Sequence, residues 1–345
     1  MKAGLTLNAL AQEITRQQDA KKDFRLATTK LLAMDDGTIE IGTEGNFTIT
    51  ENANSQISQR LKIPKQYFDR MKTKAPSLWA NNVNHWFNNF PEMRMVRTLD
   101  GKIRAFLSNR YRIMDNLALM DSVLPVLAER KDLRIESCQV TEDNFYLKVF
   151  FDNLTREVTK SSQVNDLVKF GLLVANSEVG KGGLKVQPMS FRLVCTNGMI
   201  SATSLRKNHI QGACDGLEGI VSMETQHLNN RAVFATVKDM ISHNLKDSTI
   251  SAELDRYNNA ATNKIENDII EVVEKTAKNF NINEAQTKNV LDHLIKGGDL
   301  SQWGLANAYT RTAEDIESYD EATRFEALGG KIINLKQTEW HQLAI

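Results

Sequence analysis

Basic side chains that alternate with aromatic rings could bind single-stranded nucleic acid, because cations neutralise phosphates while ring faces stack on bases. Two segments have this character. Residues 92–112 contain six Lys or Arg and two acidic residues, and residues 179–214 contain five Lys or Arg and no acidic residue. From these segments we select the following side chains as nucleic-acid ligands: Arg104, Arg110, Tyr111, Arg112, Lys181, Lys185, Arg192, Arg206 and Lys207.

The competing interpretation of these segments is structural. A run of charge often marks a solvated face, and Tyr111 could belong to the core. Phe106, on the strand face of Arg104, would be a further stacking ring if that face is open. Binding of a polyanion requires both segments to lie side by side on one exposed sheet surface, which their positions in the sequence do not establish.

Cysteine chemistry is a second possibility, raised by the stretch FRLVCTNGMISAT over residues 191–203. Asn197-Gly198 predicts a two-residue hairpin turn, with Cys195 opposite Ile200 on the core side. A nucleophilic cysteine needs a nearby base, and His209 is fourteen residues away. We therefore expect Cys195 to be structural, and an enzyme built from Cys195 or Cys214 with His209 is the weakest of three alternatives.

Cofactor and metal motifs are not found. EVGKGGLK, residues 178–185, departs from both GxxxxGK[ST] and GxGxxG, so it predicts a β-hairpin tip rather than a phosphate loop. The six histidines are scattered without metal-ligand spacing, and paired carboxylates for acid–base catalysis cannot be picked out. We expect no cofactor and no metal.

Composition favours an intracellular protein. Three cysteines without CxxC spacing suit a reducing cytoplasm, the N-terminus does not resemble a signal peptide, and no run of eighteen apolar residues could span a membrane. Lys+Arg and Asp+Glu both number 43, so net charge does not select a partner. Any nucleic-acid surface must arise from local clustering of cations.

The elements that would position these side chains indicate an α+β fold: a curved, mainly antiparallel β-sheet centre with flanking helices and a helical C-terminal region. We expect a mixed α/β N-terminal region at 1–90, a strand-rich core with the basic segments at 91–225, and the helical region at 226–345. Alternating residues predict a hairpin around Glu44–Asn46 and strands at 102–108, 144–151 and 184–195.

Local signals also predict where helices begin and end. Pro64 should lie near the start of one helix and Asp115 should cap another, which Pro125 should kink or divide. An apolar stripe over residues 253–280 predicts one long helix, and Ser301 should cap another. Gly329-Gly330 should end the last helix before a short returning strand.

Three blocks, AFLSNRYRIMDN, PMSFRLVCTNGM and WGLANAYTRTAEDIESYDEATRFEALGGKII, resemble the phage/plasmid-like protein family, a large bacterial and phage family of unknown function. The resemblance spans about residues 60–335 and implies a mobile-element origin and the host cytoplasm. More loosely, a basic curved sheet followed by helices is similar to phage single-strand annealing proteins of the RecT/Erf type, which form rings or filaments and need no nucleotide cofactor.

The leading hypothesis is therefore a phage or mobile-element protein that binds and anneals single-stranded DNA in recombination, as a homo-oligomer and without nucleotide hydrolysis. The main alternative is a protein–protein interaction module, an inhibitor or regulator of a host system, whose long C-terminal helices supply the interface.

Overall fold

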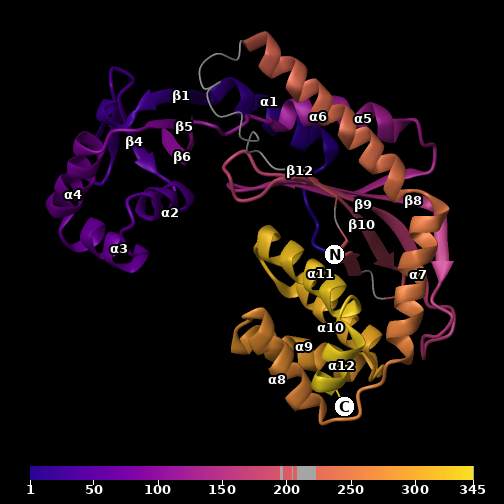
Figure 1. The fold of residues 1–345 in the computed structure, drawn as a ribbon. Coiled ribbons are helices and arrows are strands. Elements are labelled where there is room, and N and C mark those ends of the chain that lie inside the picture. Colours follow the sequence, from indigo (N-terminus) through magenta and orange to yellow (C-terminus); the bar gives the residue numbers. More distant parts are fainter. Residues whose placement is uncertain (195–196, 204, 208–222, 345) are drawn as a thin grey trace.

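The protein has the predicted α+β architecture, with two mainly antiparallel sheets and a helical C-terminal region (Figure 1). The computed structural model describes residues 1–194, 197–203, 205–207 and 223–344. Cys195, His209 and Cys214, which carried the enzyme hypothesis, lie outside the described residues.

The N-terminal lobe is a six-stranded sheet with helices on it. Its strand order is β1-β5-β6-β4-β3-β2, in which only β4 and β6 are parallel. The helix α1 (Leu7–Ala20) precedes this lobe. The elements of the lobe are β1 (Lys22–Ala27), η1 (Thr28–Lys30), β2 (Leu31–Ala33), β3 (Ile39–Ile41), β4 (Asn46–Ile49), α2 (Glu51–Arg60), α3 (Lys65–Lys74), α4 (Pro76–Asn89), β5 (Met93–Leu99) and β6 (Lys102–Ser108).

Local sequence signals are confirmed in this lobe. The hairpin around residues 44–46 joins β3 to β4, and Pro64 immediately precedes α3. The strands β5 and β6, expected in the strand-rich centre, instead pair with β1 and β4 of the N-terminal segment. They bury Val96, Ile103 and Phe106 in a core of their own with α2, α3 and α4.

The central sheet has the order β11-β10-β9-β8-β7, with β12 also paired to β10. Helices α1, α5 and α6 cover one face of this sheet, and α11 lies on the other (Figure 1). Because both faces are covered, most side chains of these strands are buried. The elements are α5 (Asn116–Ala128), β7 (Leu133–Val140), β8 (Phe145–Glu157), β9 (Leu167–Asn176), β10 (Leu184–Arg192), β11 (Asn197–Ile200), β12 (Leu205–Lys207) and α6 (Met223–Asn244).

The C-terminal region is helical, as predicted, but its helices are divided differently. The expected helix over 253–280 is two helices, because the backbone N–H groups of Glu266 and Asn267 donate to Ala344 and Asp268 caps a new helix. Ser301 caps α10 as predicted, accepting from Gly304 N at 3.1 Å. The helices are α7 (Asp247–Thr262), α8 (Ile269–Phe280), α9 (Glu284–Gly297), α10 (Gln302–Asp315), α11 (Tyr319–Ile333) and α12 (Gln337–Ala344).

Two sequence features expected to break helices do not end them. Pro125 lies inside α5, which continues past it to Ala128. Gly329-Gly330 does not end the last long helix, because α11 runs through both residues. A Cβ on Gly330 would lie 1.8 Å from the carbonyl oxygen of Ile200, so this glycine lets α11 approach the edge of the central sheet.

The Asn197-Gly198 hairpin exists, but its turn is elsewhere. Arg192 pairs with Asn197 and Phe191 with Gly198, so the connection spans residues 193–196 and the predicted register is wrong. Gly198 does not have the positive φ that the second residue of a two-residue turn requires. The buried Asn197 amide donates to Asn307 and Thr310 of α10, and this packing outweighs the local turn preference.

Candidate functional site

The two basic segments meet at the junction between the lobes. The connection from β9 to β10, residues 177–183, docks on the N-terminal lobe. The Tyr111 hydroxyl donates to the Ser177 carbonyl oxygen at 2.9 Å, while the Asn52 and Gln56 amides donate to the Val179 carbonyl oxygen at 3.0 and 2.8 Å. Sequence separation concealed this proximity, which only the fold reveals.

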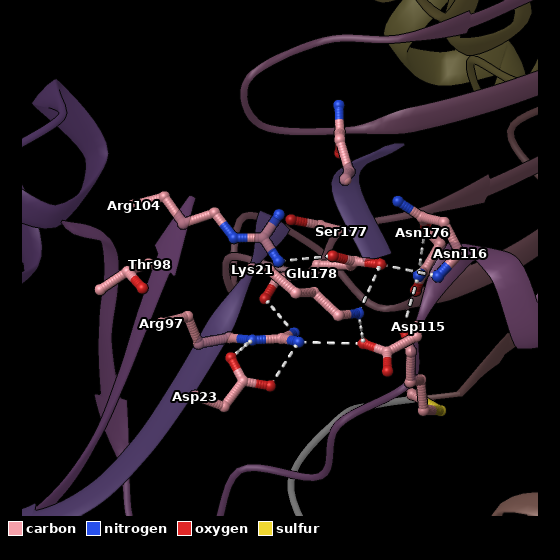
Figure 2. Close-up of polar contacts among 12 residues, drawn as sticks. Lys21, Asp23, Arg97, Thr98, Arg104, Asp115, Asn116, Asn176, Ser177 and Glu178 are labelled. Carbon is pink, nitrogen blue, oxygen red and sulfur yellow. Dashed lines mark hydrogen bonds and ion pairs between the residues drawn. The ribbon is translucent and has the colours of Figure 1, made fainter. Parts of the chain in front are cut away.

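Arg97 of β5 is the centre of a buried ion network at this junction (Figure 2). Its Nε lies 2.7 Å from Asp23 of β1, and its Nη2 lies 2.9 Å from Asp115, the residue before α5. Its Nη1 donates to the Glu178 carbonyl oxygen at 2.9 Å. Asp115 therefore makes no capping hydrogen bond to α5, although the helix begins where predicted. One guanidinium thus joins the N-terminal sheet to the central region.

Glu178 collects the remaining charges of the network. Its Oε2 lies 2.6 Å from Nη2 of Arg104, and its Oε1 accepts from the backbone N–H of Asn116 at 2.7 Å. Lys21 reaches Asp115 at 2.7 Å and Glu178 at 3.9 Å. The network therefore holds three cations, namely Lys21, Arg97 and Arg104, and three carboxylates, namely Asp23, Asp115 and Glu178.

The electrostatics of the network fit a structural role. Burial alone would raise the pKa values of Glu178 and Asp115, but Arg97 and the neighbouring cations outweigh burial and hold both pKa values below the usual range. These carboxylates stay ionised at neutral pH and offer no proton. The adjoining cavity measures about 10 Å³, which leaves no room for a substrate.

Three predicted ligands are buried, so the expectation that they face solvent is wrong. Arg104 and Tyr111 are held in the junction, and Arg192 binds both carboxylate oxygens of Asp166 at 2.6 and 2.7 Å. The Arg192 guanidinium also lies over the Trp303 ring, 5.6 Å from its centroid. Phe106, a further stacking candidate, is buried in the N-terminal core. Helices cover both sheets, and alternation alone cannot reveal that.

The other predicted ligands lie near the junction or along β10. Arg110 is exposed and Arg112 half-buried on either side of Tyr111. Lys181 is exposed at the tip of the predicted hairpin, 3.6 Å from Asp143. Lys185 is half-buried, and Arg206 and Lys207 pair through their backbones with Lys185 and Leu184, while the side chains of these two β12 residues lie outside the described set.

Sequence reasoning missed a pocket of about 590 Å³ on the α11 side of the central sheet, at the opposite ends of β9 and β10 from the junction. Cross-strand pairing puts Lys169 beside Phe191 and Arg134 beside Phe150 on one face. The two phenylalanine rings lie 5.4 Å apart. We call this the sheet-face pocket, and its lining residues are Met1, Lys2, Ala3, Arg134, Glu136, Phe150, Lys169, Phe191, Leu193 and Glu314.

Both signs of charge line the sheet-face pocket. The side chain of Arg134 is 61% exposed and lies 3.1 Å from Glu136, whereas Lys169 is mostly buried and pairs with Asp152. Glu314 binds the amino group of Met1 at 2.6 Å. Alternation of side chains along β8 and β9 weakly indicates which residues share this face. The register between the strands, which brings those residues together, is not indicated by any local sequence pattern.

The apolar stripes of the C-terminal helices are used inside the chain. Tyr257 of α7, Val272 of α8 and Val290 of α9 are buried in the same core as the central sheet. These stripes therefore do not supply the free interface that the interaction-module hypothesis assigned to them.

The described residues contain no group of three or more His, Cys, Asp or Glu placed to hold a metal ion. Over the same part of the chain, no helix has the length and apolar character to cross a membrane.

A family model described as a domain of unknown function, DUF932, matches residues 105–329. This chain belongs to the DUF932 family. The match extends from β6 into α11 and so includes the junction connection, the central sheet and most of the sheet-face pocket. No curated protein and no solved structure was found to match the chain.

Proposed function

We propose that this DUF932 protein is a phage or mobile-element protein that binds single-stranded DNA without nucleotide hydrolysis. The observation that supports the proposal is the sheet-face pocket, where Arg134 of β7, Lys169 of β9 and Phe191 of β10 share one face of the central sheet. Cations beside an aromatic ring on a sheet are the combination that single-stranded nucleic acid requires. The combination of cations and an aromatic ring is the one predicted from the sequence, but the residues that form it here are different.

Each part of the pocket has a role in this proposal. A base stacks on the half-buried Phe191 ring, which packs against the Phe150 ring of β8. Arg134 binds the phosphate, which replaces Glu136 as the ionic partner of its guanidinium. Arg134 is the most exposed cation of the strands that form the pocket. Stacking is typically worth about 1–3 kcal/mol per base, so one pocket gives modest affinity.

Annealing of two strands would require several pockets in a row. A cavity of about 590 Å³ has the size of a small-molecule site and accommodates a base with its phosphate. A longer strand would then be held by a homo-oligomer that repeats the pocket, in a ring or filament. This is the arrangement under which DNA binding would lead to strand annealing in recombination.

The proposal is tested by fluorescence anisotropy with labelled single- and double-stranded oligonucleotides over a salt series. We expect Arg134→Glu to weaken single-strand binding by about tenfold or more, because it reverses the charge that meets the phosphate. Phe191→Leu should weaken binding by about 5- to 100-fold while preserving apolar volume. The matched control is Lys131→Glu, which makes the same change of charge at an exposed position outside the pocket.

Two results would overturn the proposal. One is a wild-type affinity for single strands that is absent or does not fall as salt rises. The other is equal weakening by Lys131→Glu and Arg134→Glu, which would reflect net charge rather than the pocket. A strand-annealing assay with complementary oligonucleotides then tests whether binding leads to annealing.

A further inference from the structure

Apolar side chains are exposed along one side of α4. Leu78 and Trp86 of α4 and Phe90, the residue directly after the helix, are 51%, 38% and 63% exposed and follow one another toward its C-terminal end. The Trp86 and Phe90 rings lie 5.2 Å apart, and His85 meets the Trp86 ring edge-on at 5.6 Å. We call Leu78, Trp86 and Phe90 the α4 stripe.

The α4 stripe is not required by the core of the N-terminal lobe. The opposite side of the helix buries Trp79, Val83 and Phe87 against the sheet and α3. Helix α4 lies at the outer edge of this lobe, away from the helical C-terminal region (Figure 1). An exposed group of large aromatic residues is unusual for a surface that faces only water.

The stripe lies in a segment without charge. Residues 76–91 contain no Asp, Glu, Lys or Arg, and the polar side chains among them are mainly asparagines. Two of these asparagines fix their neighbours: Trp86 Nε1 donates to Asn82 Oδ1 at 3.0 Å, and the Asn89 amide donates to the His85 carbonyl oxygen at 2.9 Å. Aromatic enrichment with depletion of charge is the composition of the centre of a protein interface.

We propose that two copies of this chain associate through the α4 stripe. In a twofold dimer each residue near the axis meets its own copy, so charged residues there would repel one another. An uncharged stripe avoids this cost. Nucleic acid and membrane surfaces select for cations, which residues 76–91 lack, and a different protein partner would usually be steered by complementary charge.

Pairing through helices rather than strands follows from the neighbouring sheet edge. The Asn84 amide binds both the N–H of Ala33 at 2.8 Å and its carbonyl oxygen at 2.9 Å. These bonds occupy the backbone groups of Ala33 in the edge strand β2 and so block addition of a strand there.

The dimer should be weak. A helix of 14 residues is only about 21 Å long, and stable dimers bury about 1,200–2,000 Å² in total. Self-association in the micromolar range is therefore expected. The family match begins at residue 105, so this surface belongs to the part of the chain outside the matched region, and the inference does not depend on DNA binding.

Sedimentation velocity over a concentration series tests the inference. We expect the wild-type chain to shift from its mass of 38.9 kDa toward twice that value as concentration rises into the micromolar range. The double variant Trp86→Glu/Phe90→Glu should stay monomeric, with an unchanged far-UV circular dichroism spectrum because both residues are exposed. Ile270→Glu/Ile295→Glu is the matched control, since it adds the same charge at exposed apolar positions of α8 and α9.

A mixing experiment tests the twofold symmetry. Asn89 is exposed beside the stripe, so Asn89→Glu and Asn89→Lys chains should each dimerise at least tenfold more weakly than wild type, and their equimolar mixture should regain association. The inference fails if the wild-type chain is monomeric throughout, if its association survives Trp86→Glu/Phe90→Glu, or if the control pair disrupts it equally.

Discussion

At the lobe junction three cations and three carboxylates share one network, whereas beneath α11 a single lysine meets a single glutamate. In the second site Lys148 Nζ lies 2.6 Å from Glu326 Oε2 and 3.2 Å from Thr323 Oγ1, and the Lys148 and Glu326 side chains are fully buried. Glu326 Oε1 has no hydrogen-bond partner among the described residues. Both sites bury charge, but they compensate it to different degrees.

The difference appears in the pKa values of the carboxyl groups. Burial raises the pKa of Glu326, and neither Lys148, the cation that it contacts, nor the weaker attraction of the Met1 amino group reverses that effect. At the junction burial acts in the same direction on Glu178, but Arg97, Arg104 and Lys21 together bring its pKa below the usual range. A buried carboxylate is thus held firmly ionised where several cations surround it, and less firmly where it has one.

The two sites also join different parts of the molecule. The junction network links β1, β5 and β6 to the start of α5 and to the connection after β9, so it fixes the N-terminal lobe on the central sheet (Figure 2). The Lys148–Glu326 pair joins β8 to α11 within an apolar cluster that already includes Phe150 and Tyr319. We therefore expect loss of the junction to cost more than loss of the pair.

The largest effect is expected from Arg97→Ala. This change removes a fully buried cation, leaving Asp23 without its partner and Asp115 with Lys21 alone. Loss of one partner of a buried pair typically costs about 3–5 kcal/mol of unfolding free energy, and the partial exposure of both aspartates places this variant toward the lower end. Urea unfolding monitored by circular dichroism measures the loss. Because Arg97 joins the lobes, cleavage by a protease between them should also accelerate.

The control for Arg97→Ala is Arg16→Ala, which removes an arginine that pairs with Asp100 where both side chains are about half exposed. Exposed ion pairs contribute little, so this variant should unfold almost as the wild type does. Equal destabilisation by the two variants would contradict the role assigned to the network.

A smaller effect is expected from Lys148→Met. Glu326 then loses its cation but can take up a proton, because burial already raises its pKa, and a neutral carboxyl is far less costly than a charged one. The expected loss is about 1–3 kcal/mol in urea unfolding. The double variant Lys148→Met/Glu326→Met should recover most of it, since apolar residues often replace a buried pair without loss.

Failure of the second substitution to recover stability would show that Glu326 contributes through contacts other than its pairing with Lys148. If Lys148→Met destabilised the protein as much as Arg97→Ala does, the distinction between the two sites would be lost.

The sequence predicted elements whose signals are local. Ser301 begins α10 because its own hydroxyl caps the helix, and the turn near Gly45 needs only its own backbone. Asn197-Gly198 and Gly329-Gly330 carry equally strong local signals, yet contacts with α10 and the sheet edge override them. Local propensity determines where a helix or turn lies if packing does not favour another position, and tertiary contacts determine it otherwise.

The same limit applies to the cations of the first basic segment. The count of cations in residues 92–112 is correct, but Asp23 is 74 positions from Arg97 in the sequence, and Glu178 is 74 positions from Arg104. The carboxylates that neutralise these two arginines therefore lie outside residues 92–112. The sheet-face pocket was missed for a related reason, since Lys169 and Phe191 come together only through strand register.

The smallest effect should be a difference in acid sensitivity between the two sites. For Glu178 and Asp115 the folded pKa lies below the unfolded value of about 4, so their stabilisation is present above that pH and is lost as pH falls through the folded pKa values. For Glu326 the folded pKa is raised, so its contribution is present below the unfolded pKa and is lost as pH rises through the folded value.

On acidification below about pH 4, hydrogen exchange corrected for intrinsic rates should show β6 and residues 177–180 losing protection before β8 and α11. Glu178→Gln should reduce this pH dependence at the junction, because its side chain no longer titrates. Loss of protection in α11 at the same or a higher pH than at the junction would show that one lysine compensates a buried carboxylate as well as three cations do.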